Sequence, residues 1–119
     1  MTGNTGKHAA VNGLEMFYEI HGEGQPLVLL HGAFSGIGSS FGNMIPGLAK
    51  RRQVVAFELQ GHGRTADIDR PLTVEGMADD VAAALPELGV EQADILGEIP
   101  ATAMGHPACN RIVEDDVGE

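Results

Sequence analysis

The chain has 119 residues and a formal net charge of −10. A chain of this length forms a single domain, which buries only about two thirds of the surface that its unfolded form exposes. The acidic balance argues against nucleic acid or an anionic membrane as a partner, because both are bound by basic surfaces.

The first segment with a clear pattern is a β-hairpin. Residues 1–6 are polar and glycine-rich, which predicts a flexible N-terminus without an apolar leader. Asn12-Gly13 is a dipeptide that favours a type I′ turn, and alternating apolar residues follow it: Leu14, Met16, Tyr18 and Ile20. No run in the chain approaches the roughly 20 apolar residues of a membrane span, so we expect a cytoplasmic protein that does not enter a membrane.

Two apolar runs predict buried parallel strands. Leu27–Leu30 holds four branched apolar residues and is followed by His31-Gly32. Val54–Phe57 is the second run, and a glycine loop, Gly61-His62-Gly63, comes shortly after it. Continuous apolar runs occur where both faces of a strand are covered, as in the middle of a parallel sheet.

The segment between these strands predicts a short or kinked helix. Residues 39–50 carry apolar side chains at helical spacing, but Pro46 falls inside the pattern and removes a backbone donor. Lys50-Arg51-Arg52 follow. We interpret these three charges as a solvated helix end, because cations suit the C-terminal end of the helix dipole.

Residues 73–88 form the clearest predicted helix. Thr73 is a good N-cap, and apolar residues recur every three or four positions, while the acidic residues fall elsewhere: Glu75, Asp79, Asp80 and Glu87. We expect one face to pack on the sheet and the other to meet water. The regular part should end before Pro86, and Gly89 allows a left-handed cap.

The two glycine motifs at this spacing resemble the N-terminal part of the α/β-hydrolase family, over about residues 11–97. In that family a His-Gly pair follows the central strand and a Gly-x-Gly loop follows the next strand. The resemblance implies an α/β fold in residues 7–97, with a β-hairpin followed by parallel strands and crossover helices. It also implies hydrolysis of small ester or related acyl substrates, without a cofactor or a metal.

The resemblance assigns roles to the loops after these strands. In the family, the loop after the central strand supplies a backbone N–H to the oxyanion hole, and here that group would come from Ala33 or Phe34. For the His31 side chain we favour a hydrogen bond to the neighbouring loop over a catalytic role. We interpret His62 as a loop residue and Glu58 as a brace that accepts backbone donors from that loop.

The sequence departs from the family at the nucleophile. A strand, predicted at Ala93–Gly97, leads in the family into a Gly-x-Ser-x-Gly elbow, but here the residues are Gly97-Glu98-Ile99-Pro100-Ala101. Ile99 has no nucleophilic atom, and its β-branch fits a strained turn poorly. Pro100 biases the residue before it away from helical angles. We therefore expect that the elbow is not built.

Residues 98–119 are predicted to be a divergent, acidic and poorly ordered tail. In the family, the acid and the histidine follow the nucleophile on later strands, and the segment after Gly97 is too short for those units. In this tail, His106-Pro107 and then Arg111–Val113 resemble the end of the helix after the elbow and the start of the next strand in the family. An internal deletion or a frameshift near Glu98 would explain the break, which indicates a truncated remnant that is inactive alone.

Other nucleophiles lack the required context. Gly38-Ser39-Ser40-Phe41-Gly42 satisfies Gly-x-Ser-x-Gly as a pattern, but no strand delivers Ser40 to a turn, and a serine here is better explained as a helix cap. His106 and Cys109 lack the electropositive surroundings of an activated thiol and the further ligands of a metal site. As the only cysteine, Cys109 also excludes an intrachain disulfide.

Three hypotheses follow from these observations. The first is the inactive hydrolase remnant. The second is a non-catalytic interaction module, in which an exposed edge of the Ala93–Gly97 strand lets the chain self-associate or pair with a complementary chain. The third is an enzyme that uses Ser40 or Cys109.

Overall fold

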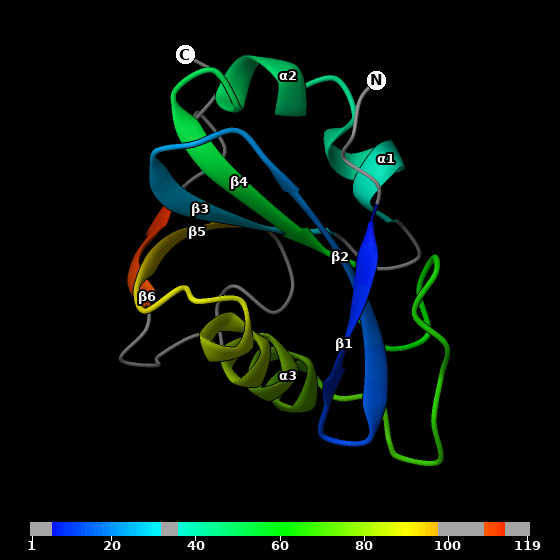
Figure 1. Cartoon of the computed structure of the whole chain (residues 1–119). Coiled ribbons are helices and arrows are strands. Elements are labelled where there is room, and N and C mark those ends of the chain that lie inside the picture. Colours follow the sequence, from blue (N-terminus) through cyan, green and yellow to red (C-terminus); the bar gives the residue numbers. More distant parts are fainter. Residues whose placement is uncertain (1–5, 32–35, 98–108, 114–119) are drawn as a thin grey trace.

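The computed structural model describes residues 6–31, 36–97 and 109–113, and these form a sheet with helices on both faces (Figure 1). In chain order, the elements are β1 (Lys7–Val11), β2 (Leu14–His21), β3 (Gln25–Leu30), α1 (Ile37–Phe41), α2 (Ile45–Leu48), β4 (Arg52–Phe57), α3 (Val74–Glu87), β5 (Ala93–Gly97) and β6 (Cys109–Val113). The sheet order is β1-β2-β4-β3-β5-β6. The pairs β1–β2 and β2–β4 are antiparallel, whereas β3 to β6 run parallel.

The hairpin of β1 and β2 confirms the prediction from Asn12-Gly13. The two turn residues have positive φ values of 53° and 83°, as a type I′ turn requires. Val11 and Leu14 pair across the turn. The register places Leu14 and Met16 in the core, as the alternation predicts.

Strand β3 lies at the centre of the sheet. Its residues Leu27–Leu30 are fully buried between β4 and β5. Leu30 lies opposite Phe57 on one side and Gly97 on the other, so the three parallel strands end at the same edge. The predicted buried strands, with α3 as the crossover between β4 and β5, are confirmed.

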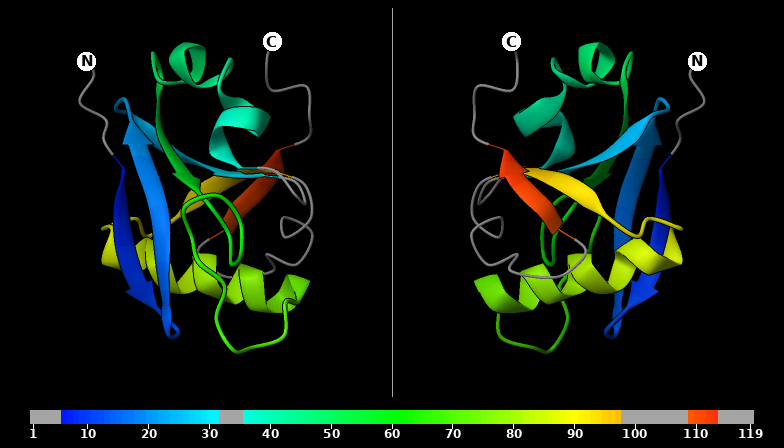
Figure 2. Two further views of the ribbon diagram at one scale, coloured as in Figure 1. Left: turned by 90° about the vertical axis from the view of Figure 1, so that its right-hand side faces the viewer. Right: turned by 90° about the vertical axis from the view of Figure 1, so that its left-hand side faces the viewer.

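Helices form the two outer layers (Figure 2). Helix α3 packs on one face, against a cluster that includes Leu30 and Phe57. The short helices α1 and α2 pack on the opposite face, over a cluster that includes Leu29 and Val54. Neighbouring residues of β3 therefore contact different layers, which explains why the whole run is apolar.

The kinked helix predicted around Pro46 is two short helices. Helix α1 ends at Phe41, and α2 begins at Ile45. Pro46 lies in the first turn of α2, where a backbone N–H has no partner within the helix and its absence costs little.

The interpretation of the charges after α2 as a solvated helix end is wrong for Arg52. This residue begins β4, and its guanidinium donates to Asp94 Oδ2 at 2.9 Å and to the Pro26 carbonyl at 3.2 Å. Pro26 lies on β3, directly beside β4, and Asp94 lies on β5, one strand further away. The Arg52 side chain contacts both because of the order of the strands in the sheet, which a local sequence pattern does not reveal.

Helix α3 begins where predicted but ends later. Thr73 Oγ1 accepts a backbone hydrogen bond of 2.9 Å in the first turn, which confirms the N-cap. The expectation that the helix ends before Pro86 is wrong, because α3 continues to Glu87. A proline in the last turn removes only one hydrogen bond, and Gly89, at a φ of 77°, closes the end in the left-handed conformation.

Asp80 corrects the expectation that all acidic residues of α3 meet water. Its side chain is fully buried. It accepts hydrogen bonds from Arg70 Nη2 at 2.7 Å and from Asn12 Nδ2 at 3.0 Å. Both donors come from other segments of the chain, so the helical periodicity of α3 contains no sign of them.

Strand β6 corrects the expectation of an open edge at β5. The two strands pair in parallel, with Ile95 opposite Ile112, so the sheet extends past residue 97 and its outer strand is Cys109–Val113. This strand contains the Arg111–Val113 segment that resembles the start of a later family strand. Within the described ranges, no helix is long and apolar enough to cross a membrane.

Candidate functional site

The carboxyl ends of β3, β4 and β5 form the edge at which parallel sheets carry their functional sites. His31 directly follows β3 and Glu58 directly follows β4. Both side chains are buried, with exposed fractions of 0% and 3%. Two polar side chains are therefore buried directly where β3 and β4 end.

Glu58 accepts four hydrogen bonds from two segments. Its Oε1 accepts from the backbone N–H of Arg64 at 2.7 Å and from Arg64 Nε at 3.0 Å. Its Oε2 accepts from Arg64 Nη2 at 3.0 Å and from the Ile37 N–H at 3.1 Å. Burial raises the pKa of this carboxyl, but the hydrogen bonds from Arg64 and Ile37 outweigh burial and lower the pKa from 4.5 to about 2. The ionised carboxylate thus ties the start of α1 to the loop after β4.

Glycines leave room for this carboxylate. Gly63 has a φ of 53°, and a Cβ at this position would overlap the Glu58 carboxylate. A Cβ on Gly36 would lie 3.0 Å from Glu58 Oε2. Gly61 also has a positive φ, of 75°. The Gly-x-Gly motif therefore lets the backbone turn back and close over Glu58.

The two histidines of the site bind the loop after β4. His31 Nε2 accepts a hydrogen bond from the Leu59 N–H at 3.0 Å, which places the proton of the neutral ring on Nδ1. The His62 ring lies against the His31 ring, with centroids 4.8 Å apart. His62 Nδ1 donates to the Gln60 carbonyl at 2.9 Å.

Arg64 and Thr65 belong to the site, and the sequence analysis missed both. The Arg64 guanidinium lies 3.9 Å from the centroid of the Phe17 ring. Thr65 Oγ1 donates to the Glu58 carbonyl at 2.6 Å and accepts from the Phe17 N–H at 2.8 Å. Both residues connect the loop to β2. The available signal was their position directly after the Gly-x-Gly turn.

A second buried network holds the other side of the same loop. Gln60 is fully buried and donates to Asp67 Oδ1 at 2.8 Å. Its Oε1 accepts from the Arg70 guanidinium, which also binds the Asp80 carboxylate of α3. The loop after β4 is therefore anchored to β2 and α1 at one end and to α3 at the other.

The structure brings five of the predicted site residues together: His31, Glu58, Gly61, His62 and Gly63. Other predicted residues lie outside the described part of the chain, namely Gly32, Ala33, Phe34, Ile99 and His106. The backbone of Ser39 and Ser40 lies in α1 and that of Cys109 in β6, but their side chains also lie outside it. Within the described ranges, no group of three or more His, Cys, Asp or Glu residues could hold a metal ion.

The sequence profile of the family described as the alpha/beta hydrolase fold matches residues 25–98. This range contains the centre of the sheet and both glycine motifs. The chain belongs to the α/β-hydrolase fold family.

Two curated relatives show how much of the family the chain contains. RutD of Azorhizobium caulinodans, whose assigned name is that of a carbamate hydrolase, is 37% identical over 83 residues, which are 70% of this chain and 31% of RutD. The soluble epoxide hydrolase of a Corynebacterium species is 36% identical over 96 residues, covering 78% of this chain and 32% of that protein. The chain thus spans about a third of the length of these relatives.

Solved structures also match the fold, each over less than half of its own length. Epoxide hydrolase CorEH superposes with a TM-score of 0.74 at 34% identity, over 78% of this chain and 32% of that one. Est816, described as an N-acyl homoserine lactone degrading enzyme, superposes with a TM-score of 0.77 at 28% identity, over 90% of this chain and 43% of that one.

Proposed function

We propose that this chain is a remnant of a hydrolase of esters or related acyl compounds, truncated or shifted in frame near Glu98, and inactive alone. The observation that supports this is the contrast at the carboxyl edge. His31 and Glu58 bind the start of the loop after β4 and the start of α1, while β5 ends at Gly97 and the family pattern then places Ile99 at the nucleophile.

An isoleucine at this position cannot form the covalent acyl intermediate on which serine hydrolases depend, because it offers no oxygen or sulfur to attack a carbonyl. The loop after β3 could still supply an oxyanion N–H, but stabilising a charge without a nucleophile gives little turnover. The relatives' names refer to carbamate, epoxide and lactone chemistry. The activity that we propose the remnant has lost is therefore hydrolysis of small molecules in the cytoplasm, with no single substrate assigned.

Hydrolysis of p-nitrophenyl acetate tests this proposal. We expect the purified wild-type chain to match the rate of the Ser39→Ala/Ser40→Ala and Cys109→Ala variants, all close to the rate in buffer. Each protein must show a cooperative thermal melt, so that inactivity is not due to unfolding. A wild-type rate well above buffer that disappears in one of these variants would contradict the proposal.

A second candidate function is a non-catalytic interaction module. Among the described residues, β6 pairs only with β5, and an outer strand presents unpaired backbone groups that a further strand can bind. The partner would be a second copy or a complementary chain. Sedimentation velocity over a wide concentration range tests self-association, and a monomer at all concentrations with a cooperative melt would count against it.

A further inference from the structure

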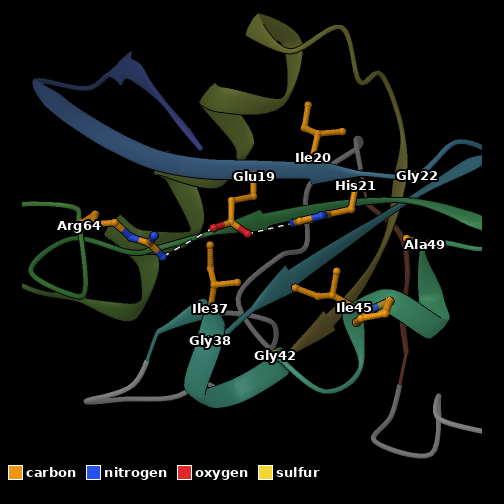
Figure 3. Close-up of a pocket in the computed structure, with 11 residues that line it drawn as sticks. Glu19, Ile20, His21, Gly22, Ile37, Gly38, Gly42, Ile45, Ala49 and Arg64 are labelled. Atoms are coloured by element: carbon orange, nitrogen blue, oxygen red, sulfur yellow. Dashed lines mark hydrogen bonds and ion pairs between the residues drawn. The ribbon is translucent and has the colours of Figure 1, made fainter. Parts of the chain in front are cut away.

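A cleft of about 760 Å³ lies between β2 and the helices α1 and α2 (Figure 3). This cleft is not the site around Glu58 at the carboxyl edge, although it shares two residues with that site, Ile37 and Arg64. The volume is in the range of sites that bind small molecules. One wall is made of apolar side chains from the helical layer: Ile37, Ile45, Pro46 and Ala49.

The opposite wall is polar, and its charges are already paired. Glu19 Oε1 lies 2.9 Å from His21 Nε2, and Glu19 Oε2 lies 3.7 Å from Arg64 Nη2. Arg64 also binds Glu58 through Nε and Nη2. Figure 3 shows Arg64, Glu19 and His21 in a row, facing Ile37 and Ile45.

One donor of this wall has no hydrogen-bond partner in the part of the chain that the structure describes. Arg64 has an exposed fraction of 55% for its side chain, and its Nη1 donates no hydrogen bond to any of the described residues. An anion that accepts from Arg64 Nη1 would lie near the carboxylates of Glu19 and Glu58, which would repel it. A cation there would be repelled by the guanidinium itself. A neutral carbonyl oxygen accepts from Nη1 without either repulsion.

We propose that this cleft binds a small neutral molecule with an apolar ring or chain and a carbonyl group. The apolar part lies against Ile37 and Ile45, and the carbonyl accepts a hydrogen bond from Arg64 Nη1. Gly38 and Gly42 keep the cleft open, since neither presents a side chain to it. The proposal does not depend on catalysis by this chain.

The test uses three naphthyl probes of similar size: 2-naphthamide, which is neutral, 2-naphthoate, which is anionic, and 2-naphthylmethylammonium, which is cationic and has no carbonyl group. Each is titrated into the ¹⁵N-labelled wild-type chain while amide shifts are followed by NMR. We expect saturable shifts confined to residues 19–22, 37–49 and 64, with the amide binding most tightly. Tighter binding of a charged probe, or shifts elsewhere, would overturn the proposal.

A matched pair of glycine variants tests the location. Gly38 lines the cleft and a Cβ there meets nothing within 4 Å, so Gly38→Leu adds a side chain at the cleft. Gly47→Leu adds the same side chain on α2 at a position that does not line the cleft, where a Cβ also meets nothing within 4 Å. We expect Gly38→Leu to weaken 2-naphthamide binding by roughly tenfold or more and Gly47→Leu to leave it unchanged. Equal affinity in both variants would contradict the proposed site.

Sedimentation velocity distinguishes a small molecule from a second copy of the chain as the occupant. We expect wild type and Gly38→Leu to sediment alike. A wild-type dimer that Gly38→Leu dissociates would show that another chain fills the cleft, and would overturn the proposal. Should Gly38→Leu not fold, the shift map of the wild-type chain still decides between the outcomes.

Discussion

The Glu58 carboxylate joins the loop after β4 to the start of α1 at the carboxyl edge. Burying a carboxylate is costly unless donors surround it, and here Arg64 and the Ile37 N–H supply them. The sequence predicts Glu58 as an acceptor of backbone donors. It does not predict Arg64, because the pairing depends on the positive φ of Gly61 and Gly63, which turns the chain back over Glu58.

The lowered pKa of Glu58 predicts how stability depends on pH. A lowered folded-state pKa means that Glu58 contributes stability above about pH 4.5, and that this contribution is lost as the pH falls toward 2. We expect Glu58→Gln to lower the free energy of unfolding at pH 7 by roughly 2 to 3 kcal/mol. Urea unfolding at a series of pH values measures the gap between wild type and variant, which should close at acidic pH. A gap independent of pH would show that the carboxylate charge is not responsible.

The close approach of Gly63 to Glu58 predicts a difference between two glycine substitutions. Gly63→Ala places a Cβ against the carboxylate at a positive φ, whereas at Gly13, which also has a positive φ, a Cβ meets nothing within 4 Å. We expect Gly13→Ala to cost about 1 kcal/mol and Gly63→Ala about 2 kcal/mol more. Chemical denaturation measures both, and equal costs would mean that the carboxylate moves aside freely.

At the scale of whole elements, local patterns are sufficient for the hairpin, the buried strands and the start of α3. Each depends on a signal within a few residues, such as Asn12-Gly13 or the Thr73 cap. The errors at single side chains concern Arg52 and Asp80, whose partners lie in other segments. Tertiary ion pairs of this kind leave no periodic trace in a sequence, so an acidic residue beside an apolar stripe is assigned to solvent even when it is buried.

The buried position of Asp80 can be tested against its exposed neighbour on α3. Asp80→Asn removes the charge that compensates Arg70, and we expect it to lower the free energy of unfolding by about 3 kcal/mol. Asp79 is exposed, so Asp79→Asn makes the same change of charge and should stay within about 0.5 kcal/mol of wild type. Thermal and urea denaturation compare the two variants. A similar small effect of both would contradict the buried network.

The N-cap of α3 gives a smaller prediction. Thr73→Ala removes the acceptor for the backbone N–H of the first turn and should cost about 1 kcal/mol, whereas Thr73→Ser keeps a hydroxyl and should cost only a few tenths. Urea unfolding resolves the difference. Equal losses for alanine and serine would assign the effect to the Thr73 methyl group instead of the cap.

For the whole molecule, family resemblance supplied what local patterns could not, namely that the predicted strands lie in one sheet of the α/β-hydrolase type. The comparisons and the sheet order bear out this assignment. Two features of the structure could not be predicted from the sequence, namely strand β6 and the cleft beside β2. Strand β6 follows a stretch without a family match, and the cleft arises only where β2, α1, α2 and Arg64 meet.

Whether the chain holds a working nucleophile can be measured from its intact mass, in the folded state, after incubation with excess fluorophosphonate, a reagent for activated serines. We expect an unchanged mass, because the family pattern places Ile99 where the nucleophile would follow β5. A stoichiometric mass gain, mapped by peptide digestion to Ser39, Ser40 or any other serine, would show a working nucleophile and would contradict the proposal that this chain is inactive alone.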